Sequence, residues 1–399
     1  MCKNESGPHS QAKDKRATIQ QNYDTILRQY EIVKPEISEK SQIFLKNYSK
    51  FALHDEAQRL VRQLYPSGNN YTKCYVCPVG SSVNVVRNPV LHRAYFRQVV
   101  TCANPMLCPV CAPRIRSRRS EEILLAAEAW KASDPENTLY MITLTFQHSI
   151  NDSLPDVMEC LKKASASFWG HRQVKKAFKL AFLLGRVSGF EITDGVHGWH
   201  PHFHILVFCK RHNFDVALFK RLWVEALGRS KLSGSEKCAF NFIESRDGSE
   251  YINKISLELG LSNNKSGRRG GLSPFQLLEK SLSGDRRAGE RFKELWQYMH
   301  ESRTPSLRWS KGLKSVFGIG EITDEEICSG LDEGFVSFAC IASRLYSRCN
   351  TEDKSSLLAF ASVGDTVSFS RYIHLVTVRE FLSRSDFDTA SMSWRFKKR

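Results

Sequence analysis

The sequence predicts an α+β fold in which helices pack on a central sheet. Two strand patterns carry this prediction, LYMITLTF at Leu139–Phe146 and HFHILVF at His202–Phe208, and both are rich in β-branched and aromatic residues. A third strand is expected at Val187–Thr193, and helical patterns lie between the strands. Strands that alternate with helices of this length form a sheet covered by helices.

The composition points to a polyanionic partner. The 399 residues include 58 Lys and Arg against 42 Asp and Glu, which leaves a net charge of +16. Such an excess favours nucleic acid first and an anionic membrane surface second. A hydrophobic share of 41% excludes a disordered chain. No apolar run is long enough to span a bilayer, and Met1–Gln20 offers no apolar stretch for a secretory signal, so a cytoplasmic location without membrane association is expected.

The chain divides into five regions. An N-terminal helical region (1–72) carries 3-to-4 apolar spacing from Gln21 to Leu64 and ends in a segment rich in Pro, Gly and Asn. A cysteine-rich module (73–120) contains a candidate hairpin at Val83–Val100. The third region (121–262) holds the sheet, and its helices are expected at Glu121–Lys131, Leu154–Leu184, Val216–Leu227 and Ser249–Leu259, with a short strand at Phe240–Ile243.

The last two regions follow a composition shift. NNKSGRRGG at Asn263–Gly271 is a basic, glycine-rich linker that opens the fourth region (263–318), and helices are predicted beyond it at Pro274–Leu282 and Ala288–Ser302. The fifth region (319–399) has several helix-like stretches and is predicted to be helical.

Cysteine spacing predicts a structural zinc site. Two C-x-x-C pairs, separated by thirty residues, supply Cys74, Cys77, Cys108 and Cys111. Each pair can form a knuckle with both thiolates on one ion, and two knuckles complete a tetrahedral zinc site with no open position for catalysis. Cys102 could replace one of the four. The alternatives are reduced core cysteines or a redox pair.

Arginines follow the second cysteine pair. Arg114, Arg116, Arg118 and Arg119 would put positive charge where a phosphate backbone could lie, and Arg268 and Arg269 of the basic linker are further candidates for DNA contact.

Four histidines fall in HGWHPHFH at His197–His204. On a strand, His202 and His204 point to one face while Phe203 points to the other, into the core. Two imidazoles on one face are ready ligands for a divalent cation, and Glu191 can complete a His-His-carboxylate set if the two strands pair. His200 has the same parity and could be a ligand or an outer-shell partner. The alternative is a polar sheet face with exposed histidines.

The helix expected at Ser249–Leu259 carries Tyr251 and Lys254 one turn apart. A lysine beside a phenol can ease formation of phenolate or steady a phosphate under attack. Taken alone this spacing is common on solvated helix faces, so it gains weight only beside the histidine strand.

Together these motifs resemble the HUH endonucleases, and among them the rolling-circle replication initiators of small bacterial plasmids. The resemblance covers roughly Cys74–Phe317. It rests on LYMITLTF, HGWHPHFHILVF and EYINK in family order, with CPVCA before them and SPFQLL (Ser273–Leu278) and LRWSKGLK (Leu307–Lys314) after them. The resemblance implies a five-stranded antiparallel sheet with the histidines at its centre and the tyrosine on a helix beside it.

The resemblance also implies an activity: metal-dependent, site-specific nicking of one DNA strand at a plasmid origin. His202, His204 and an acid would hold Mg²⁺ or Mn²⁺, and Tyr251 would keep a 5′-phosphotyrosine while the freed 3′-hydroxyl primes synthesis by host polymerase, with a host helicase. Single- and double-stranded origin DNA are the implied partners. Some relatives place a glutamate four residues before the tyrosine to activate water, and Asp247 stands there in this chain.

Two other functions fit parts of the pattern. A single-tyrosine transposase of the same superfamily would use the same residues. A non-catalytic DNA-binding regulator would need only the zinc module and the basic linker, and it would form no covalent adduct with DNA.

Overall fold

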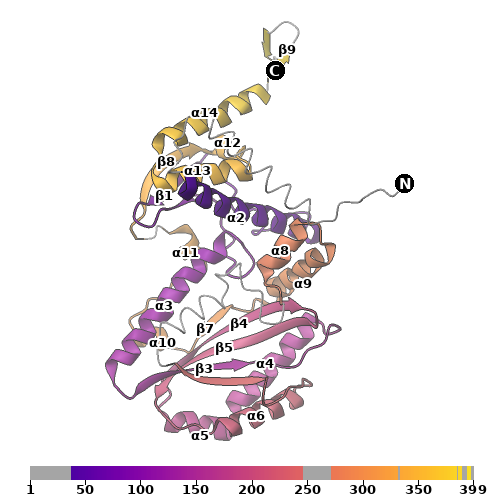
Figure 1. Cartoon of the computed structure of the whole chain (residues 1–399), viewed down its shortest axis with the longest axis vertical. Coiled ribbons are helices and arrows are strands. Elements are labelled where there is room, and N and C mark those ends of the chain that lie inside the picture. Colours follow the sequence, from indigo (N-terminus) through magenta and orange to yellow (C-terminus); the bar gives the residue numbers. More distant parts are fainter. Residues whose placement is uncertain (1–36, 246–270, 331–332, 384, 389–392, 397–399) are drawn as a thin grey trace, which may run out of the picture. The chain divides into compact units, whose positions relative to one another are not determined.

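A computed structural model describes residues 37–245, 271–330, 333–383, 385–388 and 393–396. The chain forms two compact units. One contains a five-stranded sheet and the other a three-stranded sheet (Figure 1).

The five-stranded sheet has the order β6-β3-β5-β4-β7, and all its neighbours are antiparallel. Its strands are β3 (Asn137–Leu144), β4 (Gly185–Gly195), β5 (Gly198–Lys210), β6 (Phe240–Ser245) and β7 (Leu307–Trp309). The predicted α+β architecture, with an antiparallel sheet flanked by helices, is confirmed. The histidine strand β5 lies at the centre of the order, between β3 and β4.

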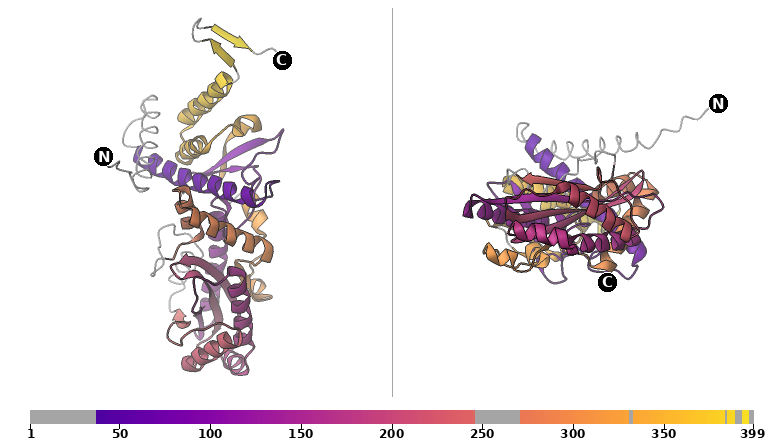
Figure 2. Two further views of the ribbon diagram at one scale, coloured as in Figure 1. Left: turned by 90° about the vertical axis from the view of Figure 1, so that its right-hand side faces the viewer. Right: turned by 90° about the horizontal axis from the view of Figure 1, so that it is seen from below.

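Helices α4 (Leu154–Gly170), α5 (Arg172–Leu180) and α6 (Val216–Arg229) cover one face of this sheet (Figure 2). Their aromatic side chains meet one another and those of the sheet: Phe168 of α4 contacts Phe219 of α6 and Phe240 of β6. The single helix predicted at Leu154–Leu184 is wrong, because His171 adopts extended backbone angles and caps α5 by accepting a hydrogen bond from the Gln173 N–H.

The opposite face of the sheet carries α3 (Cys111–Ser133). This helix begins at Cys111, well before the predicted start at Glu121. Its apolar residues Ile123, Ala126 and Ala127 join a core cluster with Met141 and Leu206 of the sheet. Leu206 lies on the same face as His204, so both faces of β5 are covered and the sheet is not an exposed histidine surface.

A tight hairpin joins β4 to β5. Gly198 has φ +86°, and a Cβ there would lie 2.9 Å from the Ser149 carbonyl oxygen, so the turn requires glycine. Behind the turn, α9 (Arg286–Ser302) supplies Arg291, whose guanidinium pairs with Asp194 at 2.6 Å and lies 3.9 Å from the Trp199 ring centroid. These contacts fix the end of the hairpin.

Three short helices complete this unit: α8 (Pro274–Leu282), α10 (Leu313–Val316) and α11 (Asp324–Ser329). The prediction of a helix at Pro274–Leu282 is confirmed, and α9 begins at Arg286 where Ala288 was predicted.

The other unit is built on α2 (Ile37–Leu64) and a three-stranded antiparallel sheet in the order β2-β1-β8. Strands β1 (Ser82–Asn88) and β2 (Arg93–Arg97) form the predicted hairpin, and β8 (Val336–Ala342) pairs with β1. The C-terminal region predicted as helical therefore also contributes strands. Its remaining elements are α12 (Ser343–Tyr346), α13 (Thr351–Val363), α14 (Thr366–Ser383), β9 (Ser385–Asp388) and β10 (Ser393–Phe396).

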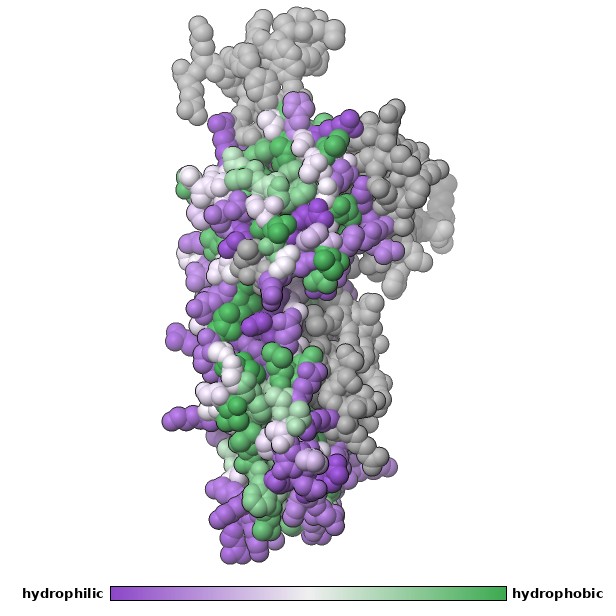
Figure 3. All heavy atoms as spheres, turned by 90° about the vertical axis from the view of Figure 1, so that its left-hand side faces the viewer, coloured by the Kyte–Doolittle hydropathy of each residue, from purple (hydrophilic) through white to green (hydrophobic). Residues whose placement is uncertain are grey.

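Hydrophobic and hydrophilic residues are mixed on the surface. Figure 3 shows hydrophobic residues as scattered groups and bands among hydrophilic ones over one face. None of the described helices combines the length and the apolar composition that a bilayer crossing requires.

Candidate functional site

Glu191, His202 and His204 form a compact group on the central strands of the five-stranded sheet. One ligand atom from each lies within 4.8 Å of the others. Glu191 Oε2 is 3.1 Å from His202 Nε2 and 3.6 Å from His204 Nε2. The cause is register: Glu191 lies directly opposite His202 across β4 and β5, and His204 follows on the same face two residues further along.

The histidines are oriented by neighbours on the sheet. His204 Nδ1 lies 3.3 Å from Thr143 Oγ1 on β3, where Thr143 is the direct cross-strand partner of His204. His202 Nδ1 lies 3.4 Å from the carbonyl oxygen of His200, which can only accept, so this nitrogen carries the proton. Each Nε2 is thereby turned toward the carboxylate, as in metal sites whose outer partners set the tautomer.

The chemistry of this donor set fits a divalent cation. Two imidazole nitrogens and a carboxylate oxygen converge from one face, and His204 is only 6% exposed. Burial raises the pKa of Glu191, but the hydrogen bonds and the charges of the His202 and His204 rings, when both are protonated, lower it further, to about 2. The carboxylate therefore stays ionised over the physiological range, as a metal ligand must.

Further side chains lie near the group of Glu191, His202 and His204. His200 lies apart from the group: its Nε2 is 3.3 Å from Thr145 Oγ1, and its ring centroid is 4.6 Å from that of His148. The His200 side chain is therefore not part of the group of three, and its carbonyl oxygen contacts the His202 ring. Thr143 and His148 were not singled out from the sequence, although a hydroxyl at alternate positions of LYMITLTF and a histidine just beyond it were the available signals.

The other candidate metal ligands are cysteines. Cys74 and Cys102 lie together in one unit, with their sulfur atoms within 4.8 Å of each other, and Cys108 and Cys111 do the same in the other unit. The predicted ligand Cys77 is in neither pair, and its sulfur lies 3.2 Å from Ser81 Oγ. Cys102 thus lies beside Cys74, where Cys77 was expected, and the ligand set of the predicted zinc site stays a prediction.

Backbone pairing explains why Cys102, and not Cys77, lies beside Cys74. The Tyr75 N–H donates to the Val100 carbonyl at 2.7 Å, and the Val100 N–H donates to Val76 at 2.8 Å. This pairing brings the segment that carries Cys102 beside Cys74. At Cys108, the Cys111 N–H donates to the sulfur at 3.3 Å, which is the knuckle contact that the C-x-x-C spacing predicted.

Most of the arginines after Cys111 have partners within the protein. The Arg114 and Arg119 side chains donate to the Cys328 and Ile322 carbonyls, and Arg119 also pairs with Asp324 at 2.7 Å. Arg118 is exposed, with a 3.5 Å contact to Glu121. Of the four, it is the one most available to a phosphate.

Arg116 lies near the histidine site. Its Nε donates to the Pro105 carbonyl at 2.8 Å. Burial lowers its pKa to about 10, and the Glu191 carboxylate acts in the opposite direction. A cation therefore stands close to the candidate metal ligands.

Five predicted site residues lie outside the described residues, so the structure does not place them: Asp247, Tyr251, Lys254, Arg268 and Arg269.

Taken together, the fold and its side-chain groups define an α+β protein with a candidate metal centre on its central sheet and further candidate ligands among its cysteines. Residues 93–228 match the family described as "Replication protein". This segment contains Glu191, His202 and His204. The resemblance to replication initiators that the motifs indicate is confirmed.

The chain is similar over part of its length to two known proteins. The chain is 24% identical over 295 residues to "Protein rep" of Streptomyces lividans, covering 55% of this chain and 64% of that protein. It is 27% identical over 134 residues to the "Neomycin resistance protein" of Streptomyces cyanogenus, covering 27% of this chain and 30% of that protein. The chain thus spans less than two thirds of each relative. No solved structure matches the chain.

The role of Thr143 can be tested by removing its hydroxyl. Thr143→Val should weaken Mn²⁺ binding about 10- to 100-fold, because outer partners that orient ligands are worth that much in metal affinity. Isothermal titration with Mn²⁺ measures it. Thr138→Val, on the same strand but bonded to Glu244, is the matched control and should bind as the wild type does. Equal affinity in both variants would contradict the assigned role.

The position of Cys102 beside Cys74 gives a second prediction. Cys102→Ser should lower the zinc content and folded yield, because structural zinc contributes folding free energy directly. Cys77→Ser should retain both. Elemental analysis of the purified variants gives the answer, and the reverse pattern would restore the ligand set expected from the C-x-x-C spacing alone.

Proposed function

We propose that this chain is a plasmid replication initiator that nicks one strand at the double-strand origin and frees a 3′-hydroxyl to prime rolling-circle replication. The observation that carries the proposal is the convergence of Glu191, His202 and His204 on adjacent strands of an antiparallel sheet. The match of residues 93–228 to the replication-protein family supports the same function.

The described residues suit the binding of a phosphodiester. His202, His204 and Glu191 would hold Mg²⁺ or Mn²⁺, which supplies Lewis-acid polarisation of a phosphate when bound. Thr143 keeps the His204 ring in place, and burial of His204 keeps bulk water away from it. Arg116 adds a fixed positive charge close to Glu191.

Tyr251 is the proposed nucleophile, by resemblance. Its phenolic oxygen forms a bond to phosphorus, the bond from phosphorus to the 3′-oxygen breaks, and the 3′-oxygen leaves and takes up a proton. The 5′-phosphate remains on the tyrosine. Lys254 would stabilise the phenolate or the phosphate, and Asp247 would activate the water that ends the reaction.

The partners in this proposal are single- and double-stranded origin DNA, with host helicase and polymerase acting on the nicked product. Arg118 is the exposed candidate for phosphate contact next to the cysteine group.

Loss of the phenol tests the proposal. Tyr251→Phe should abolish both nicking and the covalent adduct with a labelled single-stranded origin oligonucleotide in Mn²⁺, because the variant lacks the attacking oxygen. The assay scores a protein–DNA band that survives SDS, followed by peptide mapping. Tyr140→Phe is the control: its hydroxyl bonds the backbone of His212, so this variant should still form the adduct.

Two results would contradict the proposal. One is an adduct that maps to another tyrosine, such as Tyr140 or Tyr298. The other is nicking at the wild-type rate by a variant that carries both His202→Ala and His204→Ala, because those changes should cost several kcal/mol of transition-state stabilisation.

A further inference from the structure

A cavity of about 500 Å³ lies on the sheet face opposite the histidines. Its floor is made by alternate residues of the strands that carry the metal group: Ser188 and Phe190 on β4, Phe203 and Ile205 on β5. Because side chains alternate along a strand, these residues face away from Glu191, His202 and His204. The cavity is therefore separate from the candidate metal site.

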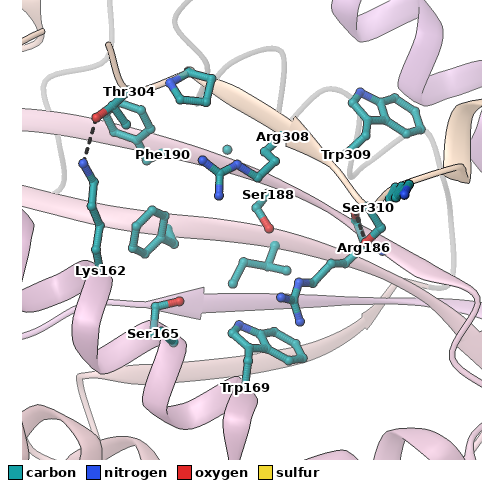
Figure 4. Close-up of a pocket in the computed structure, with 16 residues that line it drawn as sticks. Lys162, Ser165, Trp169, Arg186, Ser188, Phe190, Thr304, Arg308, Trp309 and Ser310 are labelled. Atoms are coloured by element: carbon teal, nitrogen blue, oxygen red, sulfur yellow. Dashed lines mark hydrogen bonds between the residues drawn. The ribbon is translucent and has the colours of Figure 1, made fainter. Parts of the chain in front are cut away.

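One wall is a helix face. Lys162, Ser165 and Trp169 follow one another at helical spacing on α4 and point toward the strands (Figure 4). The Arg186 guanidinium lies 4.0 Å from the Trp169 ring centroid. The backbone of Arg186 is fixed by Ser310, whose hydroxyl accepts a hydrogen bond from the Arg186 N–H at 2.9 Å. The wall thus presents a stacked arginine and tryptophan in a fixed place.

The opposite rim adds more positive charge. Arg308 on β7 is the cross-strand neighbour of Ser188, and Lys311 follows it. Lys162 is held at the rim by Thr304 Oγ1 at 2.8 Å and Tyr298 Oη at 3.1 Å. Four cations therefore line the cavity, while its lining residues include no carboxylate.

Within the described part of the chain, these cations have hydroxyl or aromatic neighbours but no carboxylate to neutralise their charge. Among the described residues, Lys162, Arg186, Arg308 and Lys311 form no ion pair with Asp or Glu. Burial lowers the pKa of Arg186, which reflects the cost of keeping its charge away from water. A bound anion would offset that cost.

Aromatic rings, hydroxyls and cations together select one chemical class. Inorganic phosphate would leave the aromatic floor uncovered, and an apolar ligand would leave the cations unpaired. A nucleobase can stack on aromatic or guanidinium planes and hydrogen-bond to hydroxyls, while its phosphate pairs with Arg or Lys. The volume lies within the usual range of ligand pockets, about 300–1,000 Å³.

We infer that this cavity binds a nucleotide, with the base against Phe203 and the Arg186 guanidinium that stacks on Trp169, and with the phosphate near Arg308 and Lys162. Two sources share this chemistry, a free nucleoside triphosphate and a nucleotide of single-stranded DNA. The inference does not rest on nicking, because it concerns the other face of the sheet and needs no divalent ion.

Photocrosslinking of the full chain in EDTA tests the inference. One arm uses a 5′-phosphorylated pentanucleotide with one 5-iodouracil, and the other uses 5-iodo-deoxyuridine triphosphate. We expect at least one probe to crosslink to the peptide that contains Trp169 or Phe203. Whichever probe does so identifies the source of the nucleotide.

Variants assign the crosslink to the cavity. Arg308→Ala and Trp169→Phe should each weaken that probe's apparent affinity, by about tenfold for Arg308→Ala, within the range known for single stacking or charge contacts. Arg221→Ala, which removes an exposed arginine of α6 outside the cavity, should bind as the wild type does. Crosslinks found only elsewhere, or an Arg308→Ala variant that equals the control, would overturn the inference.

Discussion

The register between β4 and β5 is the constraint on which the candidate metal site depends. Glu191 faces His202 directly, and a slip of one residue would move every side chain of β5 to the other face of the sheet. The hairpin end is held by Gly198 and by the contacts of Arg291 with Asp194 and Trp199. These residues lie outside the ligand group, yet they decide whether the carboxylate and the imidazoles meet.

The same alternation of side chains gives the two central strands two different surfaces. One surface presents nitrogen and oxygen ligands, and α3 covers its far end with apolar residues. The other presents Phe190, Phe203 and Arg186 beneath α4. A sheet that is covered on both faces can hold a metal group on one face and a charged aromatic cavity on the other. The same two strands fix the side chains of both.

Local patterns predicted much of this arrangement and missed what depends on distant contacts. The H-x-H strand, the partner Glu191 and the helix at Pro274–Leu282 follow from periodicity, which is a property of neighbouring residues. The position of Cys102 beside Cys74, where Cys77 was expected, depends on backbone pairing between Tyr75 and Val100. Strand β8 pairs with β1 although most of the chain lies between them. Neither pairing leaves a periodic trace in the sequence. The break at His171 was missed because a capping histidine resembles any other polar residue.

The central claim is that both histidines bind one divalent ion together with Glu191. Pulsed electron paramagnetic resonance on the full chain with one equivalent of Mn²⁺ measures this directly, since ¹⁴N couplings report imidazole ligands. The account predicts coupling to two imidazole nitrogens in the wild type, and loss of one of them in the single variant His202→Ala. A Mn²⁺ spectrum without nitrogen coupling, or one that this substitution leaves unchanged, would contradict it.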